Sequence, residues 1–305
     1  MEANELAMEF SSDVWPDWCP GCGNFGIFTA LKQALKEAGV EKEKFILVSG
    51  IGCSGKIAHF VNVSGVHTLH GRAIPFATGI KASNPSLHVM VHGGDGDLLG
   101  IGMGHFVALG RRNAEILVVV HNNGVYGLTK GQASPTLALG TKTKSQAFPN
   151  INQAVNPILL GMAAGYTFLA RGYAYNIEHL KRLFVEGLSH KGSGILEIIQ
   201  PCVTWNNIVT MDWVAKNTYY LKDWDPLLND LGQANEKKKR IMDLENGEKK
   251  ALGIFLKDLT KKTHAEMVAS INKAYLEHPP AEQGLLTNGE IPKLDINRVL
   301  QKYSL

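Results

Sequence analysis

Three short apolar segments, each followed by a glycine-rich polar loop, constrain the fold more than any other feature of the chain. They are residues 45–48 (FILV), 87–91 (LHVMV) and 116–120 (ILVVV). Uninterrupted apolar segments of this length are typical of strands that are buried on both faces. Such strands occur in parallel sheets that helices cover on both sides. The sequence therefore predicts an α/β protein with a doubly wound, mostly parallel sheet.

Stretches with helical spacing of apolar residues separate these segments. Residues 24–39 place Ile27, Leu31 and Leu35 on one helical face and end in glycine, a common helix stop. The alternation of short apolar segments with helical stretches continues to about residue 200. Further helices are expected at 100–112, 153–164 and 177–189, and further strands at 166–170 and 195–199.

Glycine and charge divide the chain into two parts. Most of the 32 glycines lie in the first two thirds, whereas charged residues are about twice as dense in the last third. We expect one α/β domain over residues 1–204, followed by a charged, mainly helical tail or arm over residues 205–305. Within the tail, the pattern of residues 251–276 suggests a helix.

Composition argues against several classes of protein. A formal net charge of +3 over 305 residues is too small to predict nucleic-acid binding. No apolar run reaches the roughly 18 residues of a membrane span, and the first residues lack the pattern of a secretion signal. Four cysteines are too few for a disulfide framework in a chain of this length. We therefore expect a cytoplasmic protein with free thiols and no contact with a membrane.

The loops after residues 87–91 and 116–120 carry the side chains of a metal and phosphate site. Gly94 and Gly96 let the backbone approach an anion closely, and the helix that follows adds its positive end. Asp95, the Asn123 amide and the Val125 carbonyl offer the oxygen ligands that Mg²⁺ prefers. Because parallel strands end at the same edge of a sheet, the two loops should meet there. The sequence thus predicts a magnesium-bridged diphosphate site, in which Asp97 orients the metal ligands without touching the metal.

The four cysteines suggest a second metal site. Cys19 and Cys22 form a Cys-x-x-Cys pair, and Cys53 and Cys202 are isolated. Four thiols suit one [4Fe–4S] cluster or one structural zinc ion, and buried thiols without a ligand are the third alternative. A zinc ribbon normally has a second Cys-x-x-Cys pair, which this chain lacks. Cys53 follows residues 45–48 and should therefore lie at the same sheet edge as Asp95.

Several motifs resemble those of a known family. The run Gly-Asp-Gly-Asp at 94–97 and the later run NNGVYGLTKGQASPT at 122–136 are similar to the diphosphate-binding domain of thiamine diphosphate enzymes. Within that group they resemble the β subunits of archaeal and bacterial 2-oxoacid:ferredoxin oxidoreductases. The motifs CPGCG at 19–23 and GIGCS at 50–54, with a late Pro-Cys, strengthen the likeness. The resemblance covers about residues 10–210.

The resemblance implies cofactors and roles for individual residues. Thiamine diphosphate and Mg²⁺ would bind at the loops after residues 87–91 and 116–120, and the four cysteines would hold one [4Fe–4S] cluster. His70 would donate to the diphosphate, and Leu128 would pack on the cofactor. Lys130 would pair with a substrate carboxylate or a coenzyme A phosphate. The expected cofactor-binding residues are Gly52, Cys53, Ser54, His70, Gly94, Asp95, Gly96, Asp97, Asn123, Val125, Tyr126, Gly127, Leu128 and Thr129.

The resemblance also implies a reaction and partners. The family oxidises a 2-oxoacid to acyl-CoA and CO₂ and passes the electrons through the cluster to ferredoxin. Thiamine activation needs a glutamate on a separate pyrimidine-binding domain, and this chain has room for only one of the two domains. We therefore expect a heterodimer with a larger subunit and no activity alone. Two alternatives remain open: a thiamine enzyme without redox chemistry (a carboligase or decarboxylase) and a zinc-stabilised module without catalysis.

Overall fold

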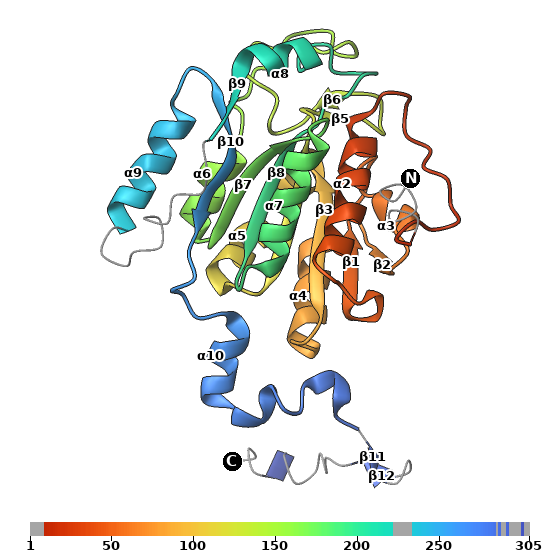
Figure 1. The fold of residues 1–305 in the computed structure, drawn as a ribbon, viewed down its shortest axis with the longest axis vertical. Helices are drawn as coiled ribbons and strands as arrows, with labels where there is room; N and C mark the ends of the chain where they lie inside the picture. Colours follow the sequence, from red (N-terminus) through yellow and green to blue (C-terminus); the bar gives the residue numbers. More distant parts are fainter. Residues whose placement is uncertain (1–8, 222–233, 285, 288–290, 293–299, 302–305) are drawn as a thin grey trace.

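An eight-stranded sheet forms the centre of the molecule in a computed structural model that describes residues 9–221, 234–284, 286–287, 291–292 and 300–301 (Figure 1). The strand order within this described part is β2-β1-β3-β4-β8-β7-β10-β9. Each strand is parallel to its neighbour in the part of this order that runs from β2 to β7, and β10 runs antiparallel to β7. The strands are β1 (Phe45–Ser49), β2 (Ser64–His67), β3 (His88–Gly94), β4 (Ile116–Asn122), β7 (Phe168–Tyr173), β8 (Gly194–Ile199), β9 (Thr218–Tyr220) and β10 (Lys250–Lys257).

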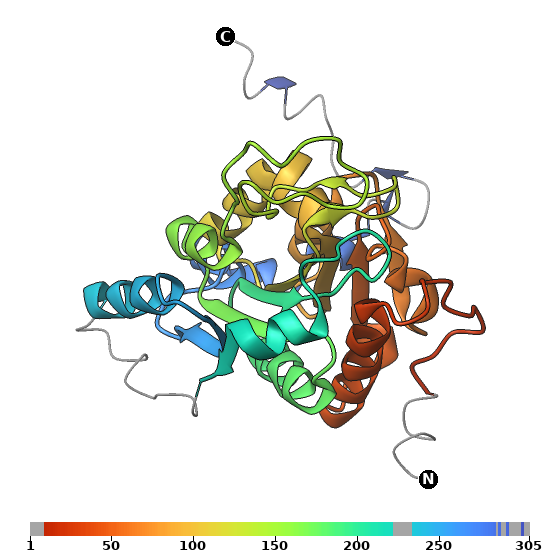
Figure 2. The same ribbon diagram turned by 90° about the horizontal axis from the view of Figure 1, so that it is seen from above.

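Helices cover both faces of this sheet, so two cores form (Figures 1 and 2). Leu117 and Val119 of β4 lie in the core under α2 and α7. The alternate residues Val118 and Val120 lie in the core under α4, α5 and α6. Burial on both faces explains why β4 is apolar without interruption. The helices are α2 (Gly23–Glu37), α3 (Ile57–Phe60), α4 (Ala73–Ser83), α5 (Met103–Arg112), α6 (Pro157–Ala164), α7 (Ile177–Ser189), α8 (Met211–Asn217), α9 (Ala234–Glu245) and α10 (His264–Ile271).

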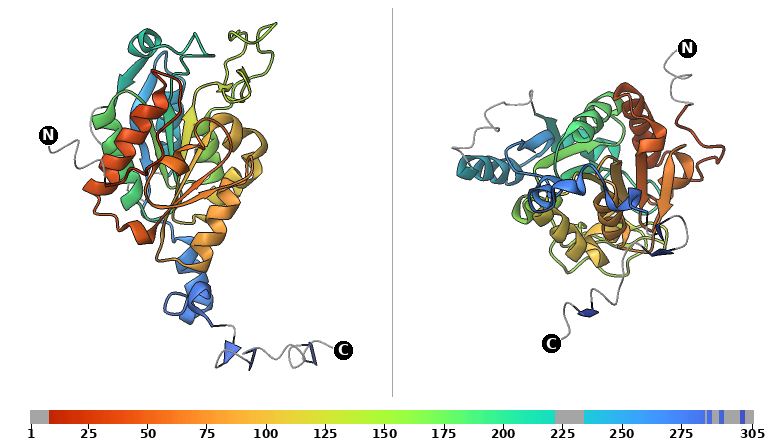
Figure 3. Two further views of the ribbon diagram at one scale, coloured as in Figure 1. Left: turned by 90° about the vertical axis from the view of Figure 1, so that its right-hand side faces the viewer. Right: turned by 90° about the horizontal axis from the view of Figure 1, so that it is seen from below.

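Shorter elements connect or extend this framework. A wide helical turn, η2, leads from β3 into α5, and the hairpin β5–β6 stands above the sheet. In Figure 3 the loops around β5 and β6 lie at one end of the molecule and α10 lies at the other. These elements are η1 (Lys42–Lys44), η2 (Asp97–Ile101), β5 (Val125–Tyr126), β6 (Gln132–Ala133), η5 (Lys273–Tyr275), η6 (Pro280–Glu282), β11 (Leu286–Thr287) and β12 (Ile291–Pro292). Within the described residues, none of the helices combines the length and the apolar character needed to span a bilayer.

The predicted doubly wound, mostly parallel sheet is confirmed, but the helix expected over residues 251–276 is wrong at its start. Residues 250–257 form β10, which joins the sheet beside β7. Ala251, Leu252 and Phe255 are buried there, so the segment follows the pattern of a buried strand flanked by lysines. A short apolar run cannot be assigned to helix or strand by its periodicity alone. The described part of the tail therefore mixes helices with two strands of the main sheet, β9 and β10, and the short pair β11–β12. The domain limit at residue 204 stays a prediction.

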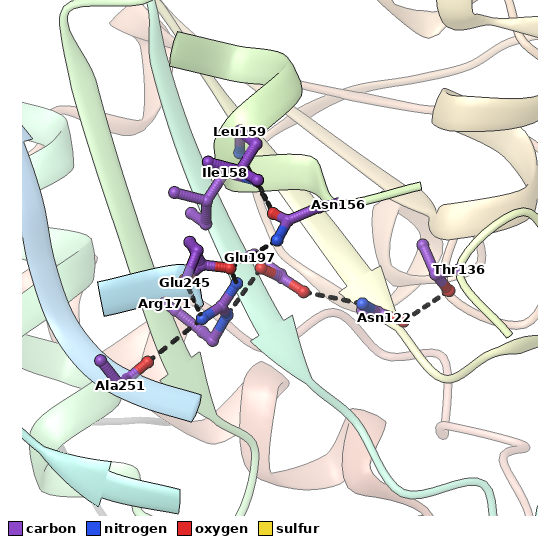
Figure 4. A network of polar contacts seen from close by, with 9 residues as sticks. All are labelled: Asn122, Thr136, Asn156, Ile158, Leu159, Arg171, Glu197, Glu245 and Ala251. Carbon is purple, nitrogen blue, oxygen red and sulfur yellow. Dashed lines mark hydrogen bonds and ion pairs between the residues drawn. The ribbon is translucent and has the colours of Figure 1, made fainter. Parts of the chain in front are cut away.

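A buried ion network ties α9 to the sheet (Figure 4). Arg171 of β7 is fully buried, and its Nε lies 2.7 Å from Oε2 of Glu197 on β8. Its two terminal nitrogens donate to Glu245 of α9 at 2.6 and 2.8 Å. Asn156, which caps α6, donates to the same Glu245 at 2.6 Å. One arginine thus satisfies two carboxylates that would otherwise be buried without a counter-ion.

Replacing Arg171 by methionine is expected to lower the free energy of unfolding by about 3–5 kcal/mol, because two buried carboxylates lose their cation. Urea or thermal unfolding followed by circular dichroism measures this loss. The matched control is Lys257→Met, since the Lys257–Glu186 pair at 2.6 Å is partly exposed and should contribute less than about 1 kcal/mol. Equal effects of the two substitutions would contradict the structural role of Arg171.

Candidate active site

The register of neighbouring parallel strands brings the predicted ligand loops to one edge of the sheet. Gly94, at the end of β3, pairs with His121 of β4, so the loops that follow start at the same level. Gly124 then donates its backbone N–H to Oδ2 of Asp95 at 3.1 Å. The two loops therefore face each other, as the sequence predicted.

Asp95 is buried and has one carboxylate oxygen without a partner. Its Oδ2 accepts hydrogen bonds from the hydroxyls of Ser134 and Thr136 in addition to the Gly124 N–H. Its Oδ1 is also buried, and no protein group donates to it. Burial raises the pKa of Asp95, and the hydrogen bonds oppose this shift. A buried carboxylate oxygen left without a donor is a ligand position that suits a hard cation.

Asn123 is held by two contacts that fix the orientation of its amide. Its Oδ1 accepts from the backbone N–H of Val125 at 3.0 Å, and its Nδ2 donates to Oε1 of Gln200 at 3.0 Å. Asn206 supports the loop from the other side by donating to the Asn123 backbone carbonyl at 2.8 Å. The amide oxygen therefore lies on the Val125 side of the residue, where the sequence predicted the magnesium ligands.

Asp97 joins the loops after β1 and β2 to the loop after β3. Its Oδ1 accepts from the backbone N–H groups of Ile51 and Gly71 at 3.1 and 2.8 Å. His70 Nδ1 lies 2.8 Å from the same oxygen. Burial raises the pKa of Asp97, although these donors work against it. Asp97 is thus placed to organise the loops around His70; its predicted effect on the metal ligands stays a prediction.

A cavity of about 230 Å³ opens among these loops. All fourteen residues expected from the sequence to bind the cofactor line it, and Ile51 joins them. They come from four separate segments, which follow β1, β2, β3 and β4. The structure therefore gathers the predicted residues around one space, while their individual roles stay predictions.

The hairpin of β5 and β6 forms one wall of the cavity. Leu128 lines the cavity and is about half exposed at 49%. Lys130 is exposed at the tip of the hairpin, outside the cavity lining, with φ of 81°. A residue with a side chain adopts this backbone conformation at a cost of roughly 1–3 kcal/mol. Lys130 is thus exposed next to Thr129, which lines the cavity, and its role stays a prediction.

The four cysteine thiols come from distant segments and converge beside this cavity. A Cβ atom on Gly127 would lie 3.5 Å from the Cys53 sulfur and 3.9 Å from the Cys202 sulfur. Burial raises the pKa of the Cys22 thiol to about 12, with smaller contributions from Cys202, Cys53 and Cys19. Backbone contacts hold their segments together: Cys22 donates to the Cys19 carbonyl at 2.9 Å, Gly23 to the Pro201 carbonyl at 3.3 Å, and the Trp18 ring nitrogen to the Cys53 carbonyl at 2.6 Å. All four are free.

The thiols are not arranged around a single ion. Across the described ranges of the chain, no group of three or more His, Cys, Asp or Glu side chains is placed to hold one metal ion. A cubane cluster carries its four thiolates on four separate irons and so needs a wider arrangement than one zinc ion does. That the four thiols hold such a cluster is therefore a prediction that rests on their proximity.

Some residues of the site carry no role in the sequence analysis. Ser134 and Thr136 belong to a motif that the resemblance uses, but only the structure shows that both donate to Asp95. Gln200 directly precedes the Pro-Cys motif and is 1% exposed. Position 200 has no characteristic sequence spacing from the candidate metal ligands. Its position at the end of a buried apolar strand is the only signal that could have identified it.

Comparisons with known proteins agree with this geometry. Residues 50–198 match the family model described as thiamine pyrophosphate enzyme, C-terminal TPP binding domain. Residues 202–273 match the family model for the C-terminal part of the pyruvate ferredoxin oxidoreductase beta subunit. The first match includes Asp95, Asn123 and the hairpin, and the second begins at Cys202.

The chain is also similar over most of its length to named proteins. It is 55% identical over 284 residues to a 2-oxoacid:ferredoxin oxidoreductase subunit beta from Sulfolobus sp, covering 91% of this chain and 93% of the relative. It is 50% identical over 295 residues to the subunit of the same name from Saccharolobus solfataricus, covering 94% and 96%.

A solved structure shows the same likeness in three dimensions. It is that of 2-oxoglutarate:ferredoxin oxidoreductase from Magnetococcus marinus with 2-oxoglutarate, coenzyme A and succinyl-CoA bound. The two chains share 32% identity and a TM-score of 0.82, with 98% of this chain and 96% of the other covered. On its sequence, its fold and the arrangement of its loops, the chain belongs to the β subunits of the 2-oxoacid:ferredoxin oxidoreductases.

Proposed function

We propose that this subunit holds thiamine diphosphate through Mg²⁺ and carries one [4Fe–4S] cluster beside it, in an enzyme that converts a 2-oxoacid to acyl-CoA and CO₂. The observation that carries the proposal is the shared position of the two donor sets. The Asp95 side chain, which has one oxygen without a partner, lines the same cavity as Cys53 and Gly127, and a Cβ atom on Gly127 would lie 3.5 Å from the Cys53 sulfur and 3.9 Å from the Cys202 sulfur. When bound, thiamine diphosphate supplies a carbon nucleophile for the ketone of the substrate, and the cluster accepts single electrons.

The residues around the cavity have separate tasks in this proposal. Asp95 Oδ1, Asn123 Oδ1 and the Val125 carbonyl hold the magnesium ion. His70 and the glycine-rich loops donate hydrogen bonds to the diphosphate. The remaining cavity residues, Leu128 among them, shield the cofactor from water.

Two further positions affect how closely the thiols and the substrates approach the cofactor. Gly127 has no side chain, so the cofactor and the thiols can lie close together without an intervening group. Lys130, exposed next to the cavity-lining Thr129, offers a positive charge to the carboxylate of the oxoacid or to a phosphate of coenzyme A.

The site is open and needs a second chain. Its volume of about 230 Å³ is below the roughly 300–1,000 Å³ of complete ligand pockets. Apolar side chains remain exposed around it, including Ile51 at 37% and Leu69 at 74%. We infer that this rim is covered by a larger subunit, which brings the pyrimidine-binding domain with its glutamate. Ferredoxin then receives the electrons, and the four free thiols suit a reducing cytoplasm.

The metal content of the purified enzyme tests the cluster. Prepared without oxygen, the protein is expected to be brown, with broad absorbance near about 400 nm and four irons per chain. Replacing Cys22 by serine should remove most of this absorbance, whereas the surface change Ser12→Ala should keep it. A colourless protein with one zinc ion per chain would contradict the proposal.

Replacing Asp95 by asparagine tests the magnesium site. The loss of one charged ligand is expected to weaken magnesium-dependent binding of thiamine diphosphate by at least the roughly 10–100-fold that metal sites lose with an outer-shell partner. Isothermal titration calorimetry of the enzyme measures this affinity. The control is Asp243→Asn, an exposed carboxylate on α9, which should leave binding unchanged. Equal affinities for the two variants would contradict the assignment of Asp95.

Activity of the separated chain tests the need for a partner. The β subunit alone is expected to show no detectable oxidation of 2-oxoacids, because it lacks the glutamate that activates thiamine. Mixing it with the larger subunit should restore reduction of ferredoxin or of a dye. Full activity of the isolated chain would disprove the shared site.

A further inference from the structure

Gln200 lies between Asn123, a predicted magnesium ligand, and Cys22, a predicted cluster ligand. It follows β8 directly and is 1% exposed. Its backbone N–H donates to the Asn122 carbonyl at 2.9 Å, which continues the pairing of β8 with β4 and fixes the position of the residue. A Cβ atom on Gly23 would lie 2.9 Å from Cγ of Gln200, so the glycine at the start of α2 leaves the space that this side chain needs.

The side-chain amide of Gln200 touches both candidate metal sites. Its Oε1 accepts from Asn123 Nδ2 at 3.0 Å, and its Nε2 lies 3.3 Å from the sulfur of Cys22. Nε2 also lies 3.4 Å from the backbone carbonyl of Pro201. One buried side chain thus connects a predicted magnesium ligand with a predicted cluster ligand.

The direction of these hydrogen bonds follows from a group whose role is fixed. The backbone nitrogen of Val125 can only donate, so the atom of Asn123 that faces it is the oxygen. The other end of the Asn123 amide is then its NH₂ group, which must meet an acceptor on Gln200. The remaining end of the Gln200 amide is therefore a donor, and it faces the Cys22 sulfur.

We propose that Gln200 is a positioning residue that couples the two cofactors: it holds the Asn123 oxygen in place for magnesium and donates an N–H to the Cys22 sulfur. The inference rests on the proposed function, because it needs a cluster at Cys22 and magnesium at Asn123. Without the acceptor on Gln200, the Asn123 amide is free to turn its oxygen away from Val125.

The hydrogen bond to sulfur is expected to change the reduction potential of the cluster in a definite direction. A reduced cluster carries one more negative charge than an oxidised one, and an N–H aimed at a ligand sulfur stabilises that charge. Gln200 therefore raises the reduction potential of the cluster. Burial raises the pKa of the same Cys22 thiol, and the Asn24 backbone N–H opposes this shift by a smaller amount.

Gln200→Met in the complete enzyme with its partner subunit tests both contacts, because methionine keeps the length and loses the amide. The reduction potential of the cluster, measured by a redox titration followed by electron paramagnetic resonance, is expected to fall. Magnesium-dependent binding of thiamine diphosphate should weaken by about 10–100-fold, as for other outer-shell partners. Gln200→Glu keeps an acceptor for Asn123 and should restore most of the magnesium affinity.

Gln153→Met is the matched control, since this glutamine is exposed. It should change neither the potential nor the affinity. A role of Gln200 in packing alone predicts lower thermal stability in Gln200→Met with an unchanged potential, and that result would overturn the coupling.

A second measurement needs no variant. In enzyme labelled with nitrogen-15 at the glutamine side-chain amides, the reduced cluster is expected to show hyperfine coupling to one amide nitrogen. Absence of this coupling would overturn the hydrogen bond to Cys22. Iron analysis of the unaltered enzyme separates the two possible failures. An enzyme without a cluster refutes the proposed function, whereas a cluster without the coupling or the change in potential refutes the role of Gln200.

Discussion

The in-register parallel pairing of β1, β3, β4 and β8 is the constraint on which the rest of the site depends. Ser49 pairs with His92, Gly94 with His121, and Asn122 with Ile199. Because the strands are parallel and level, every segment that follows them leaves the sheet at the same edge. These segments carry Cys53, Asp95, Asn123 and Cys202 in turn. Backbone hydrogen bonding alone therefore collects donors that lie far apart in the sequence.

A second constraint is the cost of burying the polar groups that this edge requires. Thr136 Oγ1 lies within hydrogen-bond distance of both Asp95 and the Asn122 side-chain oxygen, 2.8 Å from the latter, and can donate its one proton to either. Asn122 donates to Glu197 at 2.7 Å. Glu197 is in turn paired with Arg171 (Figure 4). A series of polar contacts thus extends from the site through Arg171 to Glu245 on α9. The C-terminal part of the chain supplies that last carboxylate, so it contributes to the same polar network as the site.

The sequence predicts those features that depend on local pattern. The uninterrupted apolar segments identify β1, β3, β4, β7 and β8, and the residue types in the loops identify the candidate ligands. Features that depend on tertiary contacts could not be found in this way. The apolar run in β10 becomes a strand because the edge of β7 is available to it, and its periodicity alone also allows a helix. A role for Gln200 can be inferred only from its distances to Asn123 and Cys22 in the folded protein.

The glycine at position 127 lets the hairpin backbone lie close to two of the cysteines. Gly127 lines the cavity together with Cys53, and a Cβ atom at position 127 would contact the sulfurs of both Cys53 and Cys202. A longer side chain at this position would therefore crowd the two thiols. The hairpin therefore has two opposing requirements: it must stay thin at Gly127 and still close the cavity through Leu128. A glycine followed directly by leucine meets both requirements. The wall of the site therefore changes from bare backbone at position 127 to a large apolar side chain at position 128.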